Sequence, residues 1–322
     1  MNEERLDAPG PRPEFAPKRG ARNNLHPTDQ RAKRSSRTTA NSLSCSSAGA
    51  GRGPNGGFWG TRTYSCTTAT GASSVLWAYT VMKRLLLLAL IAVACEAIAQ
   101  DAKCVSERAA MVETIRAYAR SDADLLGPQG ISESVLEAMG QTERHRFIPG
   151  RSCSAAYMDG PVPIGQGQTI SQPFIVALMT HLAAVKFDHT VLEVGTGSGY
   201  QAAILARLAR KVCTVEIIPP LAEAAAKVLR ELGYDNVSVK VGDGYHGWPE
   251  CGPFDAIVVT AALGHVPLPL IEQLKVGGRL VMPLGPAHAP QQLTVIEKIA
   301  PSETRMRSII LVNFVPFTRS QD

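Results

Sequence analysis

The chain has 322 residues, of which 45% are hydrophobic and 19% charged, and its formal net charge is +5. Residues 1–81 contain 11 Lys and Arg against 5 Asp and Glu, whereas residues 82–322 have a net charge of −1. A nearly neutral body argues against nucleic-acid binding through a basic surface. The seven cysteines form no C-x-x-C pair, so we expect no zinc knuckle, no redox dithiol and no metal site.

Residues 1–81 are rich in Arg, Ser, Thr, Gly, Asn and Pro and show no sustained apolar periodicity. Such a segment buries too little apolar surface to offset the entropy that is lost on ordering. It also lacks the interleaved aromatic pattern of an RNA-binding segment. We expect a disordered basic extension, or one that is not translated.

Residues 82–99 are built like a secretory signal peptide. They combine a basic start, Met82-Lys83-Arg84, with an apolar run over 85–94 and small residues, Ala97 and Ala99, in the segment Ala97-Ile98-Ala99. The run is too short for a stable membrane span, and no polar face accompanies its leucines, which argues against a helix of a larger domain. Translation from Met82 and cleavage after Ala99 would explain the pattern. A lipoprotein anchor at Cys95 is a weaker alternative, because Ala92 stands where a larger aliphatic residue is usual.

Residues 100–322 are predicted to form one globular domain. Helical periodicity covers 107–118 and 132–139, and Ser132 can cap the second helix. The stretch 157–172 is dense in Gly and Pro, which predicts an ordered loop, and a helix follows over 173–185.

The cysteines of this domain leave their pairing open. Cys104 and Cys153 are able to form a disulfide if the protein is exported. Cys213 lies inside a strand pattern, so we expect it to be buried as an apolar filler.

Strands and helices alternate after residue 189, which predicts an α/β fold. The expected elements are strand 190–194, helix 200–209, strand 212–217, helix 219–232, strand 237–241, strand 255–259, helix 267–274 and strand 278–282. Two further strands, 292–299 and 307–314, look antiparallel. The prediction is a Rossmann-like, mostly parallel sheet with helices on both faces and antiparallel closing strands.

A glycine triplet follows the strand 190–194. Gly195, Gly197 and Gly199 alternate with Thr196 and Ser198, and a helix begins at Tyr200. Alternate glycines let the backbone turn sharply and approach a bound molecule closely. The spacing G-x-G-x-G differs from the G-x-G-x-x-G dinucleotide fingerprint, which favours S-adenosylmethionine over NAD. A plain glycine-rich connection is the structural alternative.

Three other predicted strand ends carry suggestive residues, and ligands of open parallel sheets bind at that edge. Glu216 can accept hydrogen bonds from both ribose hydroxyls. Asp243, with Gly244 beside it, can accept the adenine amino hydrogen, although a simple turn also explains G-D-G. Residues 260–262, Thr-Ala-Ala, leave room for a reacting group. Since no histidine base or carboxylate pair stands at this rim, the substrate is expected to be nucleophilic itself.

The loop 165–173 is rich in glycine, amides and hydroxyls and ends in a proline that starts a helix. A capping role for Ser171 explains its composition as well as a binding role does.

The chain resembles the protein-L-isoaspartate (D-aspartate) O-methyltransferase family from about Met111 to Phe317. The resemblance is carried by G-Q-T-I-S-Q-P at 167–173, V-L-E-V-G-T-G-S-G-Y-Q-A-A at 191–203, G-D-G at 242–244, P-F-D at 253–255, T-A-A at 260–262 and Q-L-K-V-G-G-R-L-V-M-P-L-G at 273–285. The glycine motif alone indicates only a methyltransferase, whereas the G-Q-T-I-S block is specific to this family.

The resemblance implies S-adenosyl-L-methionine as cofactor and damaged proteins with isoaspartyl residues as substrate. The free α-carboxylate of such a residue takes the methyl group, and the ester closes to a succinimide, which is repaired in part to aspartate. Ser171 matches the active-site residue of the family, and the resemblance predicts that Thr169 and Ile170 line the same cleft.

The resemblance also implies a cytoplasmic monomer without nucleic-acid partners. The signal-like segment makes the periplasm the alternative location, where the supply of cofactor is unexplained. The rival functions are a methyltransferase of the same fold that acts on a small molecule or RNA, and an inactive cofactor-binding relative.

Overall fold

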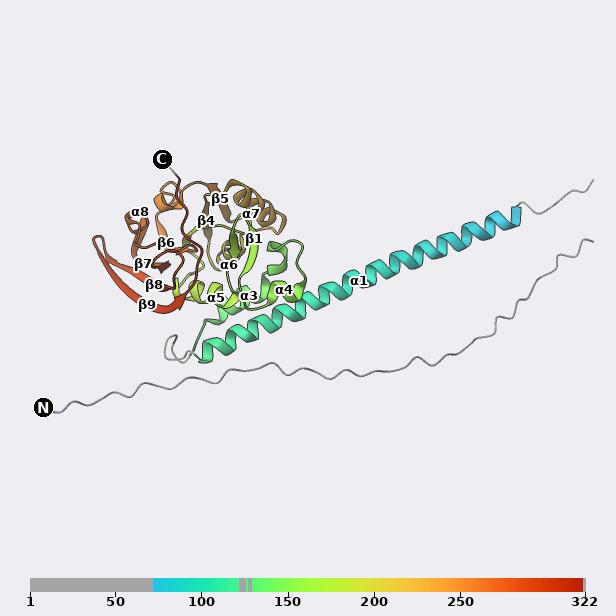
Figure 1. The fold of residues 1–322 in the computed structure, drawn as a ribbon, viewed down its shortest axis with the longest axis horizontal. Coiled ribbons are helices and arrows are strands. Elements are labelled where there is room, and N and C mark those ends of the chain that lie inside the picture. The colour runs from blue at the N-terminus through green and yellow to red at the C-terminus, as the bar shows by residue number, and fades with distance from the viewer. Residues whose placement is uncertain (1–71, 122–125, 127–128, 321–322) are drawn as a thin grey trace, which may run out of the picture. The chain divides into compact units, whose positions relative to one another are not determined.

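A computed structural model describes residues 72–121, 126 and 129–320 (Figure 1). Most of the expected extension, residues 1–71, lies outside the described residues, as does most of the connection between Ser121 and Gly130. The chain divides into two units, residues 1–67 and 68–322, and every described residue belongs to the second. None of the described helices is long and apolar enough to cross a membrane.

The described chain alternates helices and strands as predicted. The helices are α1 (Ala72–Ser121), α3 (Glu133–Gln141), α4 (Cys153–Tyr157), α5 (Pro173–Leu182), α6 (Tyr200–Leu208), α7 (Pro219–Glu231) and α8 (Leu268–Gln273), with the short 3-10 helices η1 (Arg144–Phe147) and η2 (Gly244–His246). The strands are β1 (Val162–Gly165), β2 (Gln168–Ile170), β3 (Thr190–Val194), β4 (Lys211–Glu216), β5 (Val237–Val241), β6 (Phe254–Val259), β7 (Leu274–Leu284), β8 (Gln291–Ala300) and β9 (Glu303–Val312).

Seven strands form one sheet in the order β5-β4-β3-β6-β7-β8-β9. The five strands from β5 to β7 are parallel, and β8 and β9 are antiparallel additions at the end of the chain. This confirms the predicted fold class. The chain builds the sheet outward from β3 in one direction and then continues at β6 on its other side. Beyond the carboxyl ends of β3 and β6 there is consequently a crevice suited to a ligand.

Both faces of this sheet are covered, because side chains alternate along each strand. Val191 and Val258 belong to a core cluster that includes buried residues of α3, α5 and α6. Leu192 and Ile257 point to the opposite face, where they share a cluster with Leu270 of α8. The strands at the centre are therefore apolar on both sides, which explains why they read as continuous hydrophobic runs.

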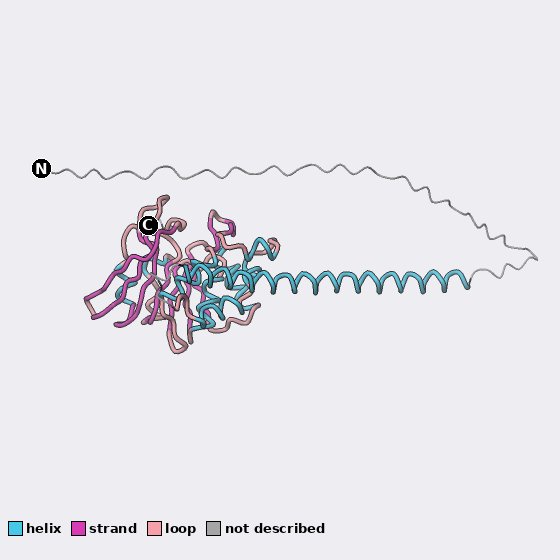
Figure 2. The backbone as a smooth tube through the Cα atoms, turned by 90° about the horizontal axis from the view of Figure 1, so that it is seen from below, coloured by secondary structure: helices cyan, strands magenta, loops and turns pink. Residues whose placement is uncertain are grey.

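Helix α1 contains the predicted helix 107–118 and continues through the signal-like segment (Figure 2). Leu85, Leu86, Leu87 and Leu88 are 59–61% exposed, whereas Met111 and Ile115, further along the helix, are buried in the core. The leucines of the signal-like segment thus take no part in the core of the domain. Export remains a prediction.

Two local expectations need correction. The stretch 157–172 contains the hairpin β1–β2, whose turn has positive φ angles at Gly165, Gln166 and Gly167. Helix α5 ends at Leu182 rather than at residue 185, because Ala184 adopts a positive φ of 49°. These short elements depend on turn geometry, which composition does not define.

Two disulfides tie the domain together. Cys104 is bonded to Cys153, the pair that the sequence allowed. Cys213 is fully buried as expected, but it is bonded to Cys251, so its interpretation as a mere filler is wrong. The strand pattern revealed the burial of Cys213. It carried no information on the loop before β6, which brings Cys251 to β4.

Candidate active site

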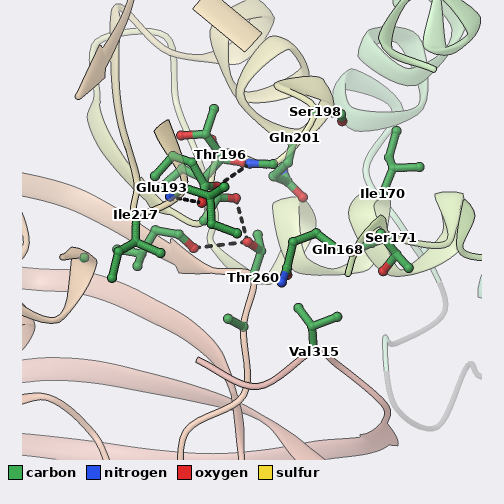
Figure 3. Close-up of a pocket in the computed structure, with 18 of the residues that line it drawn as sticks. Gln168, Ile170, Ser171, Glu193, Thr196, Ser198, Gln201, Ile217, Thr260 and Val315 are labelled. Carbon is green, nitrogen blue, oxygen red and sulfur yellow. Dashed lines mark hydrogen bonds between the residues drawn. The ribbon is translucent and has the colours of Figure 1, made fainter. Parts of the chain in front are cut away.

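A pocket of about 780 Å³, including the open space at its mouth, lies beyond the carboxyl ends of β3, β4 and β6 (Figure 3). The predicted site residues in its lining are Thr169, Ile170, Ser171, Gly195, Thr196, Gly197, Ser198, Glu216 and Gly244. Gly199 and Asp243 were also predicted, but they are outside the lining.

Two glycines of the lining are required by close contacts. Gly195 has a φ of 97°, and a Cβ atom there would collide with Oγ1 of Thr260. The Thr260 hydroxyl donates a hydrogen bond to the Gly195 carbonyl oxygen over 2.7 Å, which joins the ends of β3 and β6. At Gly244 a Cβ atom would collide with Cγ1 of Val194. At both positions the backbone packs too closely against a neighbouring strand end for any side chain to fit.

Gly199 serves packing instead. It is the N-cap of α6 with a φ of 87°, and a Cβ atom there would lie 3.3 Å from Ala225 and Leu229 of α7. The third glycine thus lets α6 begin close to α7.

Glu216 lies at the end of β4 and is 5% exposed. Its Oε2 accepts a hydrogen bond from the Gly197 amide at 2.8 Å, and its Oε1 accepts one from the Ile218 amide at 3.0 Å. Each carboxylate oxygen has two acceptor positions, so capacity remains for ligand hydroxyls. An acid about twenty residues beyond the glycine loop, at the end of the next strand, binds ribose hydroxyls in dinucleotide folds, so the position of Glu216 fits the ribose of an adenosyl ligand.

Glu193 borders the same pocket and was not predicted. It is fully buried in β3, where Oε2 accepts a hydrogen bond from the Thr214 hydroxyl at 2.6 Å. Oε1 has no partner among the described residues. Burial raises the pKa of Glu193 to about 8, against the lowering effect of the Thr214 hydrogen bond. The sequence does indicate Glu193, because an acid inside a buried apolar strand is costly unless it has a partner or a function.

Asp243 follows β5 and is bound to other residues of the chain. Its Oδ1 accepts a hydrogen bond from the Tyr245 amide at 2.9 Å, and its Oδ2 accepts one from Nε of Arg319 at 2.7 Å. Burial acts to raise the pKa of Asp243, but the hydrogen bonds from Arg319 and Tyr245 outweigh it and lower the pKa. Contact with adenine stays a prediction for this residue.

Ser171 lies between β2 and α5, and its side chain borders the pocket (Figure 3). The N-cap of α5 is Gln172, and the amide of Phe174 donates to Oδ1 of Asp159 at 3.0 Å. The capping role considered for Ser171 is thus performed by Asp159. Val315 and the residues that follow it up to Thr318 complete the lining, and they were not predicted because they come from the far end of the chain.

The pocket lining contains two acids but no histidine, lysine, arginine or cysteine. Within the described ranges no group of His, Cys, Asp and Glu side chains could hold a metal ion. The lining therefore offers hydrogen bonds and carboxyl groups, and it contains no imidazole, amine or thiol.

The fold and site define the class of S-adenosylmethionine-dependent methyltransferases. Typical of this class is a glycine loop after the central strand β3, together with an acid at the end of the next strand, β4. Residues 125–322 match the model of the family described as Protein-L-isoaspartate(D-aspartate) O-methyltransferase. The chain belongs to this family, as its sequence motifs predicted.

Known proteins agree with this assignment. Protein-L-isoaspartate O-methyltransferase 2 of Polaromonas sp. is 54% identical over 208 residues, which cover 65% of this chain and 99% of the relative. A solved protein-L-isoaspartate O-methyltransferase has a TM-score of 0.58 and 28% identity, and the match covers 65% of each chain. A Plasmodium falciparum structure, described as a putative member in complex with S-adenosyl-L-homocysteine, shares the fold with a TM-score of 0.54, 23% identity, and coverage of 66% of this chain and 98% of that one.

Proposed function

We propose that this chain transfers the methyl group of S-adenosylmethionine to the free α-carboxylate of L-isoaspartyl residues in damaged proteins, and to D-aspartyl residues in addition. The methyl ester then closes to a succinimide, whose hydrolysis returns normal aspartate in part. One observation carries the proposal: the glycine loop with Glu216 and the segment Thr169–Ser171 border the same pocket. The first fits the cofactor, and the second belongs to the block by which the sequence resembles this family.

S-adenosylmethionine is the cofactor, and it supplies an electrophilic methyl group on a sulfonium centre when bound. Glu216 is suited to accept hydrogen bonds from ribose hydroxyls. Glu193 also borders the pocket, and its Oε1 has no hydrogen-bond partner among the described residues. Gly195 and Gly197 keep the backbone open to close approach. Glu216 and the absence of a basic side chain in the lining favour a cationic guest, whereas Glu193 is largely protonated at neutral pH because burial raises its pKa to about 8.

The acceptor needs little activation, because a carboxylate is anionic at neutral pH. The protein then contributes to catalysis by orienting the carboxylate oxygen and by excluding water. We assign to the Ser171 hydroxyl a hydrogen bond to this carboxylate, with Thr169 and Ile170 lining the cleft. A covalent role for Ser171 is disfavoured, since the lining contains no histidine or lysine that could activate it.

We further propose that the enzyme works in the periplasm, after cleavage near Ala99. Disulfides are rare in reducing cytosol, and the described residues contain the pairs Cys104–Cys153 and Cys213–Cys251. The need for a supply of S-adenosylmethionine, which is unexplained in the periplasm, favours the cytoplasm instead. Mass spectrometry of the protein from its host decides between them: an N-terminus at Gln100 without free thiols supports export, and an uncleaved chain in which Cys104, Cys153, Cys213 and Cys251 are free thiols would contradict it.

The decisive assay compares two peptides that differ only in Asp against isoAsp at one position. The full chain with radiolabelled S-adenosylmethionine should label the isoAsp peptide and leave the Asp peptide unlabelled. Equal labelling of both peptides would sink the repair function. No labelling, with S-adenosylhomocysteine still bound in a titration, would support the inactive relative instead.

A further inference from the structure

Arg144 lies behind the segment that carries Ser171, and its side chain is fully buried. Its Nε donates a hydrogen bond to the Ala156 carbonyl oxygen at 2.8 Å, and its Nη2 donates one to the Ser171 carbonyl oxygen at 2.8 Å. The guanidinium carbon lies 4.9 Å from the centre of the ring of Tyr200, which itself borders the pocket. Arg144 therefore connects η1 and α4 with two residues of the pocket wall.

The charge of this guanidinium is not balanced by a direct ion pair. None of the ion pairs among the described residues includes Arg144, and its Nη1 is buried without a hydrogen-bond partner there. Burial lowers the pKa of Arg144, while Tyr200 and Asp159 act to raise it. An apolar side chain would fill this space at a smaller cost in desolvation. The buried cation thus requires an explanation outside core packing.

The other end of the same segment is held by an acid. Asp159 accepts a hydrogen bond at Oδ2 from Nε2 of Gln172 over 2.6 Å, and its Oδ1 accepts the Phe174 amide over 3.0 Å. The backbone is therefore fixed at the Ser171 carbonyl by Arg144 and directly after it by Asp159. When both attachments hold the backbone, only rotation of the Ser171 side chain can change where its hydroxyl points.

We propose that Arg144 is a positioning residue for the methyl acceptor. It fixes the main chain at Ser171, and its buried positive charge, which contacts Ser171 and Tyr200 of the pocket lining, attracts the acceptor carboxylate. This rests on the proposed function, because the attracted group is the free carboxylate of an isoaspartyl residue. A buried charge attracts an opposite charge more strongly than an exposed one does, because less water screens the interaction.

Two substitutions separate the charge from the hydrogen bonds. Arg144→Gln removes the charge and keeps a side-chain donor, whereas Arg144→Lys keeps the charge and loses the planar fork. For Arg144→Gln we expect kcat/KM for the isoAsp peptide to fall about 100-fold, as is usual when a reacting group is slightly misplaced. Most of the change should be a higher KM for the peptide, with unchanged binding of S-adenosylhomocysteine. Arg144→Lys should recover part of the loss in KM.

Lys298 provides a matched control. It is 7% exposed, and its Nζ donates to the carbonyl oxygens of Ile271 and Leu274 at 2.8 Å, outside the pocket lining. Lys298→Gln should lower the melting temperature as a buried cation is lost, yet leave both KM values unchanged. Wild-type KM in Arg144→Gln, or the same KM shift in both variants, would overturn the proposal.

Asp159→Asn keeps the proposal testable if the Arg144 variants do not fold. It weakens the second attachment, so KM for the peptide should rise while the binding of S-adenosylhomocysteine is retained; an unchanged KM overturns the inference. Hydrogen exchange separates this inference from the proposed function. If the wild-type chain methylates no isoAsp peptide, the proposed function fails, whereas faster exchange over residues 168–174 in Arg144→Gln than in Lys298→Gln still supports positioning.

Discussion

Arg319 donates a hydrogen bond from Nε to Oδ2 of Asp243 over 2.7 Å, and its guanidinium lies 3.7 Å from the centre of the Tyr245 ring. The hydroxyl of Ser320 reaches the same carboxylate oxygen at 3.2 Å. These contacts tie the end of the chain to the turn after β5. The residues between them and β9 include Val315 and Thr318, which border the cofactor pocket. The tie thus holds one wall of the pocket in place.

Arg319→Gln should weaken the binding of S-adenosylhomocysteine. A hydrogen bond to a charged group contributes more than a neutral one, and partial exposure reduces its worth, so we expect a loss of about threefold to tenfold. Faster ligand release, followed by stopped-flow fluorescence, should account for the loss. Arg305→Gln, on the exposed part of β9, is the control and should bind as the wild type does. Equal affinities in both variants would show that the pocket wall needs no tie.

Glu216→Ala should weaken cofactor binding by about 1–3 kcal/mol, because it removes a charged acceptor. Glu216→Gln is not conservative here, since its amide nitrogen would face the N–H group of Gly197 or of Ile218. We expect both variants to lose affinity in calorimetric titrations with S-adenosylhomocysteine. Glu223→Gln, an exposed acid on α7, controls for net charge. Wild-type affinity in Glu216→Ala would remove this residue from the site.

The sequence revealed the parts of the site that are local. Gly195, Gly197 and Glu216 follow directly from strand ends, because a parallel sheet brings those ends to one edge. The same logic selected Asp243, but its partner Arg319 is 76 residues away and nothing in the local pattern predicts their meeting. Glu193 was not predicted, although its signal is local: it is an acid inside a buried apolar strand, directly before the glycine loop.

Ser171→Ala should lower kcat for the isoAsp peptide while the fold is retained. The start of α5 is capped by Asp159, so the hydroxyl is not needed there, and we expect the free energy of unfolding to change by less than about 0.5 kcal/mol. Loss of one hydrogen bond to the anionic acceptor predicts a decrease in rate of about tenfold to 100-fold, because hydrogen bonds to charged groups contribute about 1.5–3 kcal/mol. Initial rates and urea unfolding of the same preparation measure both quantities. An unchanged rate, or a large loss of stability, would assign Ser171 to the scaffold.

Glu193 predicts a pH dependence of stability. Its pKa rises from the ordinary 4.5 to about 8 in the folded chain, mainly because the side chain is fully buried. Between these values the folded state binds more protons than the unfolded state, so the stabilisation is complete below pH 4.5 and is lost as the pH rises toward 8. Glu193→Gln stays neutral throughout. Relative to this variant, the wild type without cofactor should lose stability by up to about 1.4 kcal/mol per pH unit within that window. Urea unfolding of both proteins from pH 5 to 8 measures the difference, and parallel curves would show that Glu193 is ionised in the fold.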